Sequence, residues 1–231
     1  MNAIAIIPAR SGSKGLPDKN ITEVLGRPLI DYTIKPAIES GCFDTVMVST
    51  DSEKYAKISR DCGAEVPFLR SELTSGDSAG TWDAVREVLV NYSKIGRDFD
   101  YVAVLQPTSP LRNADDIRGI FDMLKSENVR NAVTVTETAH PVQWCFTLDE
   151  DRSLKEYASS PYNQVRRQDL EKHYQENGAI YLVDAKKIMD ENYNFYDDDC
   201  YAYIMPRERS VDIDEKIDLI IFEAILAEQC K

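Results

Sequence analysis

The chain has 231 residues, with 40 acidic and 27 basic side chains and a formal net charge of −13. So acidic a chain is poorly suited to general binding of nucleic acid or of anionic membranes, and its basic residues must therefore act locally. No apolar run approaches the roughly 20 residues of a membrane span, and the apolar N-terminus lacks a basic leader, which predicts a cytoplasmic protein without a signal peptide. The length suits one substantial domain with a small appended lobe.

The five cysteines are odd in number, widely scattered and without a CxxC pair, and only two histidines accompany them. A zinc site needs closely spaced ligands, so none is expected. The cysteines are Cys42, Cys62, Cys145, Cys200 and Cys230. We interpret them as reduced, structural thiols.

The first element in chain order joins an apolar strand, residues 3–8, to a loop that extends to Asn20 in the run IAIIPARSGSKGLPDKN. The loop combines two glycines with three cations, namely Gly12, Gly15, Arg10, Lys14 and Lys19. Glycine lets the backbone pass close to an anion, and the cations neutralise it, so this segment predicts a phosphate-binding loop. Its spacing matches neither a Walker A loop nor a GxGxxG dinucleotide fingerprint.

Beyond this loop, strands alternate with amphipathic helices. Helices are expected over 29–40, 52–62, 81–92 and 114–126, and strands over 45–50, 65–69, 101–105 and 133–136. Gly41 and Gly63 are typical helix stops, whereas Pro36 interrupts the first helical pattern. Such alternation predicts an α/β fold with a Rossmann-like, mostly parallel sheet and helices on both faces.

Polar residues follow four of the predicted strands: Arg10, Asp51, Arg70 and Gln106. In an open α/β sheet, ligands bind beyond the carboxyl ends of the strands. We therefore expect these side chains to converge on one ligand.

The alternation stops after residues 133–136. Residues 140–176 contain an acidic turn and little that fits another βα unit, so we interpret them as an inserted lobe within a single domain spanning 1–231. The sheet is predicted to resume at 178–183 and 201–205. A C-terminal helix over 215–229 follows, with Ile217, Ile220, Ile221 and Ile225 as its apolar side.

Asp212 and Asp214 precede that helix in the run SVDID. In an extended segment both carboxylates point to one face, while Ile213 points to the other. Two carboxylates on one face suit Mg²⁺, whose shell substrate phosphates and waters complete. The alternative is a chance DxD in an acidic chain, which also contains DDD at residues 197–199.

Together, a cationic glycine loop and paired carboxylates are suited to transfer of a phosphoryl or nucleotidyl group. Nucleotidyl transfer is favoured over hydride transfer. A serine or cysteine nucleophile is disfavoured, because His140 and His173 lie in no triad context and no GxSxG is present.

Six motifs in order resemble those of the N-acylneuraminate cytidylyltransferases, also called CMP-sialic acid synthetases. They are IIPARSGSKGLPDKN, VSTD at 48–51, LQPTSPLR at 105–112, RRQD at 166–169, NGAIY at 177–181 and SVDID at 210–214. They cover nearly the whole chain. The first motif alone would also suggest the Kdo cytidylyltransferases or other sugar nucleotidyltransferases.

The resemblance implies that CMP passes from CTP to the anomeric hydroxyl of a nine-carbon 2-keto acid sugar, with release of pyrophosphate. Arg10, Lys19 and Asp214 are the implied catalytic residues. The implied nucleotide-binding positions are Ala9, Arg10, Ser13, Lys14, Lys19, Asn20, Arg70, Ala79 and Thr81. Asp212 and Asp214 are the implied ligands of Mg²⁺ or Mn²⁺, and Asp214 is the candidate to ease deprotonation of the hydroxyl, directly or through metal-bound water.

On the acceptor side the resemblance implies Gln106, Arg167, Asn177 and Gly178. It also implies a homodimer in which the inserted lobe at about 140–176 contacts the partner's active site and Arg167 is contributed across the interface.

Two positions depart from several bacterial relatives, which carry basic residues where this chain has Gln143 and Gln175. N-acetylneuraminate, its deaminated form, legionaminate and pseudaminate are therefore all candidate acceptors. Two alternatives stay open: another sugar nucleotidyltransferase using Kdo or a sugar 1-phosphate, and a non-catalytic nucleotide-sugar binding protein.

Overall fold

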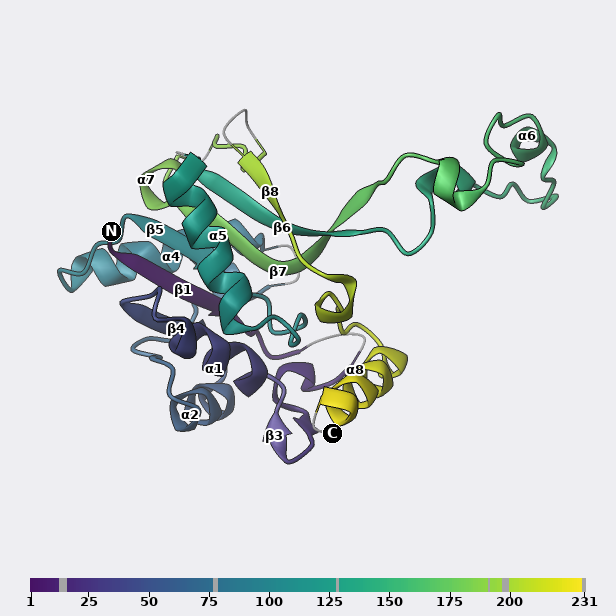
Figure 1. Cartoon of the computed structure of the whole chain (residues 1–231). Coiled ribbons are helices and arrows are strands. Elements are labelled where there is room, and N and C mark those ends of the chain that lie inside the picture. Colours follow the sequence, from purple (N-terminus) through teal and green to yellow (C-terminus); the bar gives the residue numbers. More distant parts are fainter. Residues whose placement is uncertain (13–15, 77–78, 128, 191, 197–199, 230–231) are drawn as a thin grey trace.

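A computed structural model describes residues 1–12, 16–76, 79–127, 129–190, 192–196 and 200–229. Its centre is a six-stranded sheet in the order β4-β1-β5-β7-β6-β8 (Figure 1). The strands are β1 (Ala3–Pro8), β4 (Thr45–Ser49), β5 (Tyr101–Val104), β6 (Asn131–Glu137), β7 (Tyr174–Asp184) and β8 (Cys200–Ile204). Paired strands run parallel except where β7 pairs with β5 and β6. The predicted Rossmann-like α/β fold is confirmed.

Helices cover both faces of the sheet. The longer ones are α1 (Asp31–Ser40), α2 (Glu53–Asp61), α4 (Thr81–Lys94), α5 (Ala114–Glu127) and α8 (Lys216–Gln229). Short ones are α3 (Glu72–Ser75), α6 (Lys155–Ala158), α7 (Ala185–Ile188) and the 3-10 turns η1 (Lys19–Ile21), η2 (Val142–Trp144), η3 (Arg167–Asp169) and η4 (Arg207–Arg209). A small hairpin, β2 (Glu23–Val24) with β3 (Arg27–Pro28), lies outside the main sheet.

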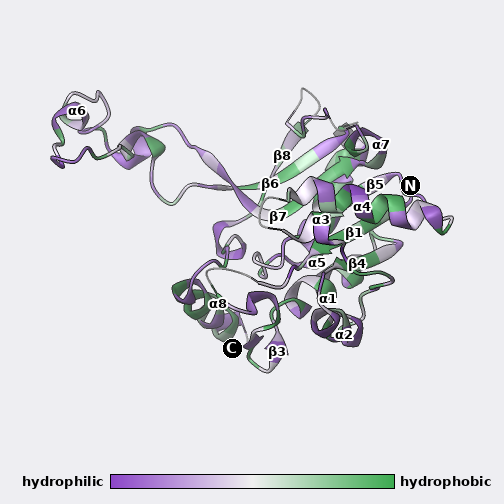
Figure 2. Cartoon of the chain, turned by 180° about the vertical axis from the view of Figure 1, so that it is seen from behind, coloured by the Kyte–Doolittle hydropathy of each residue, from purple (hydrophilic) through white to green (hydrophobic). Residues whose placement is uncertain are grey.

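The apolar run of β1 explains its central place in the sheet. Successive side chains of a strand point to opposite faces, and here Ala5 and Ile7 enter one core while Ile4 and Ile6 enter the other. The first core contains residues of α1, α2 and α5, and the second contains residues of α4 and α7. Figure 2 shows the hydrophobic residues concentrated in the central strands and in α8. A strand buried on both faces anchors the loop that follows it.

Two predicted elements differ from the structure, and one element of the structure was not predicted. The strand expected over 65–69 is wrong, because only Glu65 forms a bridge, to Met47, and the chain then leaves the sheet at Val66-Pro67. Helix α1 begins at Asp31 and continues through Pro36. The short α3 was not predicted.

The predicted apolar side of the C-terminal helix is also wrong for three of its four residues. Ile217, Ile220 and Ile221 are 55%, 53% and 42% exposed, whereas Phe222 is fully buried. Phe222 packs edge-to-face on Tyr32 of α1, with ring centroids 5.1 Å apart. This contact fixes α8 against the body of the molecule.

Residues 138–173, between β6 and β7, form an arm that projects away from the sheet (Figure 1). Only Pro141 of the arm is buried. The strand β7 starts at Tyr174, earlier than the predicted strand at 178–183, so its first residues lie within the stretch predicted as an insertion.

Candidate active site

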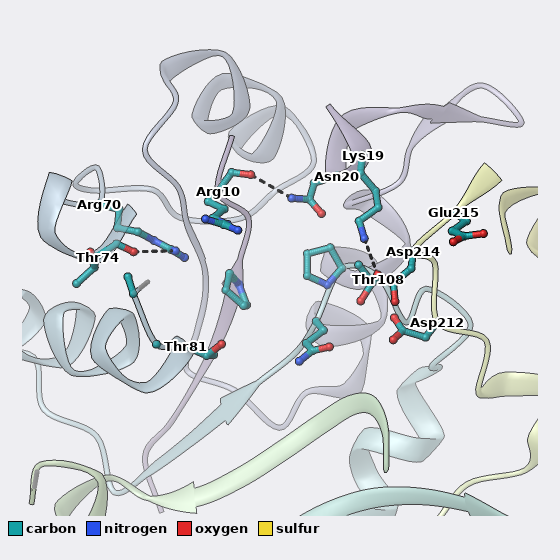
Figure 3. Close-up of a pocket in the computed structure, with 15 residues that line it drawn as sticks. Arg10, Lys19, Asn20, Arg70, Thr74, Thr81, Thr108, Asp212, Asp214 and Glu215 are labelled. Carbon is teal, nitrogen blue, oxygen red and sulfur yellow. Dashed lines mark hydrogen bonds and ion pairs between the residues drawn. The ribbon is translucent and has the colours of Figure 1, made fainter. Parts of the chain in front are cut away.

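A pocket of about 630 Å³ lies beyond the carboxyl ends of β1 and β5 (Figure 3). Its lining comprises Pro8, Arg10, Lys19, Asn20, Arg70, Thr74, Ala79, Gly80, Thr81, Gln106, Pro107, Thr108, Asp212, Asp214 and Glu215. Arg10 and Arg70 lie on one side of it, and Lys19 with the two aspartates lies on the other. The topology thus brings together segments separated by up to about 200 positions in the sequence.

Lys19 reaches the aspartate segment from η1. Its Nζ donates to the Ile213 carbonyl at 2.7 Å and to Asp214 Oδ1 at 3.0 Å. The Lys19 side chain is 12% exposed and that of Asp214 is 74% exposed. The ammonium is therefore held in place at the wall of the pocket, while the carboxylate remains open to solvent and to ligands.

The start of the phosphate-binding loop is fixed by Asp51, which follows β4. Its carboxylate accepts hydrogen bonds from the Ser11 N–H and the Ser11 Oγ, both at 2.7 Å. Burial raises the pKa of Asp51, but the hydrogen bonds from Ser11, together with the Asp51 N–H and the charge of Arg70, outweigh burial, so the pKa lies below its ordinary value. The neighbouring Arg10 carbonyl accepts a hydrogen bond from Asn20 Nδ2 at 3.4 Å, which joins the two ends of the loop.

Arg70 is tied to the end of β4. Its Nε donates to Ser49 Oγ at 3.1 Å and its Nη2 to the Ser49 carbonyl at 3.0 Å. Burial lowers the pKa of Arg70, against the opposing charges of Asp51 and Glu87. Arg70 therefore presents a fixed guanidinium at the side of the pocket away from the aspartates. Ala79 and Thr81 line the same pocket.

The aspartate segment has the predicted alternation. Ile213 is fully buried and its N–H donates to the Thr108 carbonyl at 2.8 Å, while Asp212 and Asp214 on either side line the pocket. Burial raises the pKa of Asp212, and the charges of Asp214 and Asp218 raise it further, opposed by the Thr108 hydrogen bond and by Lys19.

The donor set of this segment suits a hard divalent cation. Among the described residues no group of three or more His, Cys, Asp and Glu side chains could enclose a metal ion. Two carboxylates are nevertheless enough when substrate phosphates and waters complete the shell of Mg²⁺. The pKa of Asp212 is raised chiefly by burial and further by the charge of Asp214, and a cation held between the two carboxylates would favour the ionised form of both.

Gln106 and Gly178 adjoin each other at the acceptor side predicted from the sequence. Gly178 has φ +68°, and a Cβ placed on it would lie 2.6 Å from Gln106 Oε1. Asn177 is buried: its Nδ2 donates to Ser210 Oγ at 2.9 Å, and its carbonyl accepts from Ser109 Oγ at 2.9 Å. The Asn177 side chain is therefore used within the protein, and Gly178 permits the close approach of β7 to Gln106.

Other predicted site residues lie elsewhere. Arg167 is in η3 on the arm and lines a separate hollow with Lys172 and Tyr174. Ala9 is buried, and its N–H donates to the Ser49 carbonyl at 2.9 Å. Ser13 and Lys14 lie outside the described residues.

An aromatic recess adjoins the main pocket and was not predicted. It has a volume of about 170 Å³, shares Thr81 and Gln106 with the main pocket, and is completed by Trp82, Val104, Tyr181 and Tyr196. The Trp82 ring stacks on Phe195 with centroids 5.0 Å apart. Tyr181 was signalled by NGAIY and Trp82 by its place after Thr81, but no sequence pattern indicated Tyr196.

The architecture is that of nucleotidyltransferases. The fold matches a solved structure of CMP:2-keto-3-deoxy-manno-octonic acid synthetase complexed with CTP, with a TM-score of 0.71, 17% identity and coverage of 99% of this chain and 100% of that one. It also matches 4-diphosphocytidyl-2C-methyl-D-erythritol synthase from Anaerococcus prevotii, with a TM-score of 0.64, 15% identity and 98% coverage of both chains. The chain belongs to the cytidylyltransferase family, whose model matches residues 4–215.

Curated relatives agree with this family. The N-acylneuraminate cytidylyltransferase of Streptococcus agalactiae serotype V is 39% identical over 95% of this chain, which spans only 52% of that relative's length. The CMP-N,N'-diacetyllegionaminic acid synthase of Legionella pneumophila is 35% identical, with 98% of this chain and 97% of the relative covered. The pseudaminic acid cytidylyltransferase of Campylobacter jejuni is 33% identical, with 95% and 94% covered.

Proposed function

We propose that this protein transfers CMP from CTP to the anomeric hydroxyl of a nonulosonic acid. One observation carries the proposal: Arg10, Lys19, Asp212 and Asp214 line a single pocket beyond the sheet's carboxyl edge. Cations there can hold a triphosphate, and carboxylates can hold a divalent cation against it. The names of the relatives supply the acceptor class, since two that match over nearly their whole length are named for legionaminic and pseudaminic acid.

In the proposed reaction the sugar hydroxyl attacks the α-phosphorus of CTP, a new P–O bond forms, and the bond to pyrophosphate breaks. Arg10 and Lys19 offset the negative charge that grows on the leaving pyrophosphate. Asp214 receives the hydroxyl proton, directly or through water. Arg70, Ala79 and Thr81, which line the pocket, enclose the cytosine, and Asn20 steadies the nucleotide.

Asp212 and Asp214 are the residues proposed to hold Mg²⁺ or Mn²⁺. When bound, the cation would neutralise phosphate charge and orient the triphosphate. Lys19 contributes here as well, because its ammonium holds Asp214 at one position of the pocket wall.

The acceptor is proposed to bind at the end of the pocket marked by Gln106, which opens to the aromatic recess. Tyr181 and Tyr196 offer ring faces that suit a sugar with apolar substituents, and the Tyr181 hydroxyl, which donates to Glu176 Oε2 at 3.0 Å, can still accept a hydrogen bond from the sugar. Asn177 and Gly178 support this end by fixing β7 beside Gln106.

We further propose a homodimer built through the arm. The arm exposes Val142, Phe146, Leu148, Leu154 and Tyr162, each at least 45% exposed. A segment with almost no buried apolar residue gains little from burial within its own chain, whereas a partner subunit can cover such a surface. In the dimer, Arg167 reaches the partner's pocket.

The proposal is tested by pyrophosphate release from CTP and Mg²⁺ with a nonulosonic acid, for the unmodified protein and for Arg10→Ala and Asp214→Ala. Removal of one preorganised charged group is expected to lower turnover by about 100- to 1000-fold. Lys57→Ala, an exposed cation of α2 outside the pocket, is the control and should keep full activity. Rates near the unmodified level in both site variants would refute the assigned roles.

A further inference from the structure

The segment that carries Asp212 and Asp214 depends on side-chain contacts for its position. Residues 205–215, between β8 and α8, contain no regular element except η4. A loop of this kind is free to move unless neighbouring elements hold it. The contacts of Arg209 and Ser210, immediately before Val211-Asp212, therefore decide where the carboxylates lie.

Arg209 is held by a carboxylate of α5. Its Nε donates to Asp116 Oδ2 at 2.9 Å and its Nη2 to Asp116 Oδ1 at 2.7 Å. This bidentate geometry fixes the orientation of the guanidinium as well as its distance. The Asp116 side chain is 1% exposed and that of Arg209 is 27% exposed, so water competes poorly for the carboxylate.

Asp116 is itself fixed by the first turn of α5. Its N–H donates to Asn113 Oδ1 at 3.0 Å, and its Oδ2 accepts from the Asn113 N–H at 3.1 Å. This reciprocal pair has the form of a capping box. The carboxylate that orients Arg209 is therefore part of a rigid helix start.

A second anchor follows directly. Ser210 Oγ accepts from Asn177 Nδ2 at 2.9 Å and donates to the Pro206 carbonyl at 2.8 Å. On the far side of Asp212, the Ile213 N–H binds the Thr108 carbonyl. Asp212 is thus held between anchors on α5, on β7 and on the loop after β5.

We propose that Asp116 and Arg209 are positioning residues that place Asp212 and Asp214 for the divalent cation and the triphosphate. This inference rests on the proposed function, because it concerns the same two aspartates. Displacement of reacting groups by about 1 Å can cost on the order of 100-fold in rate. Outer partners of metal ligands typically contribute about 10- to 100-fold in metal affinity or activity.

Positioning and simple electrostatics predict different results for Arg209→Gln. If Arg209 acted only through its charge, removing that cation would strengthen cation binding at the nearby aspartates. If it positions the segment, its removal weakens cation binding. Asp116→Asn weakens cation binding in both cases, so Arg209→Gln is the decisive variant.

The experiment measures Mn²⁺ binding in the presence of CTP by electron paramagnetic resonance, without turnover. Asp116→Asn, Arg209→Gln and Arg209→Lys are expected to weaken Mn²⁺ binding by about tenfold or more, and the double variant Asp116→Asn with Arg209→Gln no more than the worse single one. CTP affinity in EDTA should remain unchanged in all of them. Asp115→Asn is the matched control, because Asp115 lies in the same first turn but is 80% exposed and pairs with Arg118.

Unchanged or tighter Mn²⁺ binding in Arg209→Gln would overturn the inference, as would an equal loss in Asp115→Asn. Loss of CTP affinity in EDTA in parallel with Mn²⁺ affinity would also overturn it, since that pattern indicates general damage to the fold. If Asp116→Asn does not fold, Arg209→Gln and Arg209→Lys still test whether the pair positions the aspartate segment. Asp214→Asn separates the positioning role from the metal site itself. If Mn²⁺ binding is weakened only in Asp214→Asn, the positioning role of Asp116 and Arg209 is refuted and the metal site stands. If the unmodified protein does not bind Mn²⁺, the metal site is refuted and the inference with it.

Discussion

At the scale of single residues, the loop after β1 is held by the carboxylate of Asp51. Its two hydrogen bonds from Ser11 are charge-assisted, and they connect β4 to the first residues of the loop that carries Arg10. From the sequence, Asp51 was correctly expected at the carboxyl ends of the strands, but Ser11 was not expected as its hydrogen-bond partner. Hydrogen-bond partners depend on the path of the backbone, which the pattern of residue types does not specify.

The lowered pKa of Asp51 gives a pH-dependent prediction. A carboxyl whose folded pKa is lowered stabilises the protein above its unfolded pKa of about 3.9, and this contribution is lost as the pH falls through the folded pKa. We expect Asp51→Asn to lower the free energy of unfolding by about 1.5 kcal/mol at pH 7. The difference from the unmodified protein should shrink below pH of about 4.

Urea unfolding at a series of pH values measures this difference. Asp61→Asn, at the exposed end of α2, is the control and should change stability little at any pH. A deficit in Asp51→Asn that persists undiminished at low pH would show that the carboxylate charge is not its source.

At the scale of elements, β7 shows what sequence patterns can and cannot predict. The run NGAIY indicated a strand, and the strand is present, but its start at Tyr174 and its antiparallel pairing were not expected. Patterns report local burial and period, whereas strand direction follows from the long connection through the arm. The missing strand at 65–69 and the exposed isoleucines of α8 were mispredicted for the same reason. In both cases residues distant in the sequence determine which side chains are paired or buried.

The left-handed Gly178 of β7 gives an element-scale prediction. Gly178→Ala places a Cβ in the left-handed region, at a cost of about 1 to 2 kcal/mol, and also pushes Gln106 away from its position. We expect lower stability and a raised KM for the acceptor, with little change in the KM for CTP. Steady-state kinetics with each substrate varied in turn, together with thermal unfolding, measure these effects.

Gly96→Ala is the matched control. Gly96 has φ +76° but nothing within 4 Å of a Cβ placed there. Gly96→Ala therefore strains the backbone without displacing a neighbouring side chain. An acceptor KM raised as much in Gly96→Ala as in Gly178→Ala would contradict the role assigned to the contact with Gln106.

At the scale of the whole molecule, the arm explains why Arg167 lies outside the pocket of its own chain. The sequence indicated an interruption of the βα pattern, and the structure has an arm over residues 138–173 there, with Arg167 on it. The pocket that holds Arg10, Lys19 and the two aspartates is built from one chain. In the proposed dimer, the second chain adds the guanidinium of its Arg167. No helix among the described residues has the length and apolarity needed to cross a membrane.

Mixing two inactive variants tests this dimer. If Arg167 acts in the partner's pocket, Arg167→Ala and Asp214→Ala each lack activity, but their heterodimers contain one complete pocket. After the subunits are exchanged, about a quarter of the unmodified activity should return, because half of the dimers are mixed and each has one intact site. Light scattering should give twice the chain mass. No recovery on mixing, or a fully active monomer, would contradict the proposal.

The central claim is that this cytidylyltransferase transfers CMP to a nonulosonic acid, and an acceptor panel tests it most directly. The protein is incubated with CTP and Mg²⁺ and, in separate reactions, with N-acetylneuraminate, its deaminated form, legionaminate, pseudaminate, Kdo or a sugar 1-phosphate, and products are identified by mass spectrometry. We predict a CMP-sugar and an equal amount of pyrophosphate with at least one nonulosonic acid. A nucleotide product formed only with Kdo or a sugar 1-phosphate, or none with any acceptor, would contradict the account.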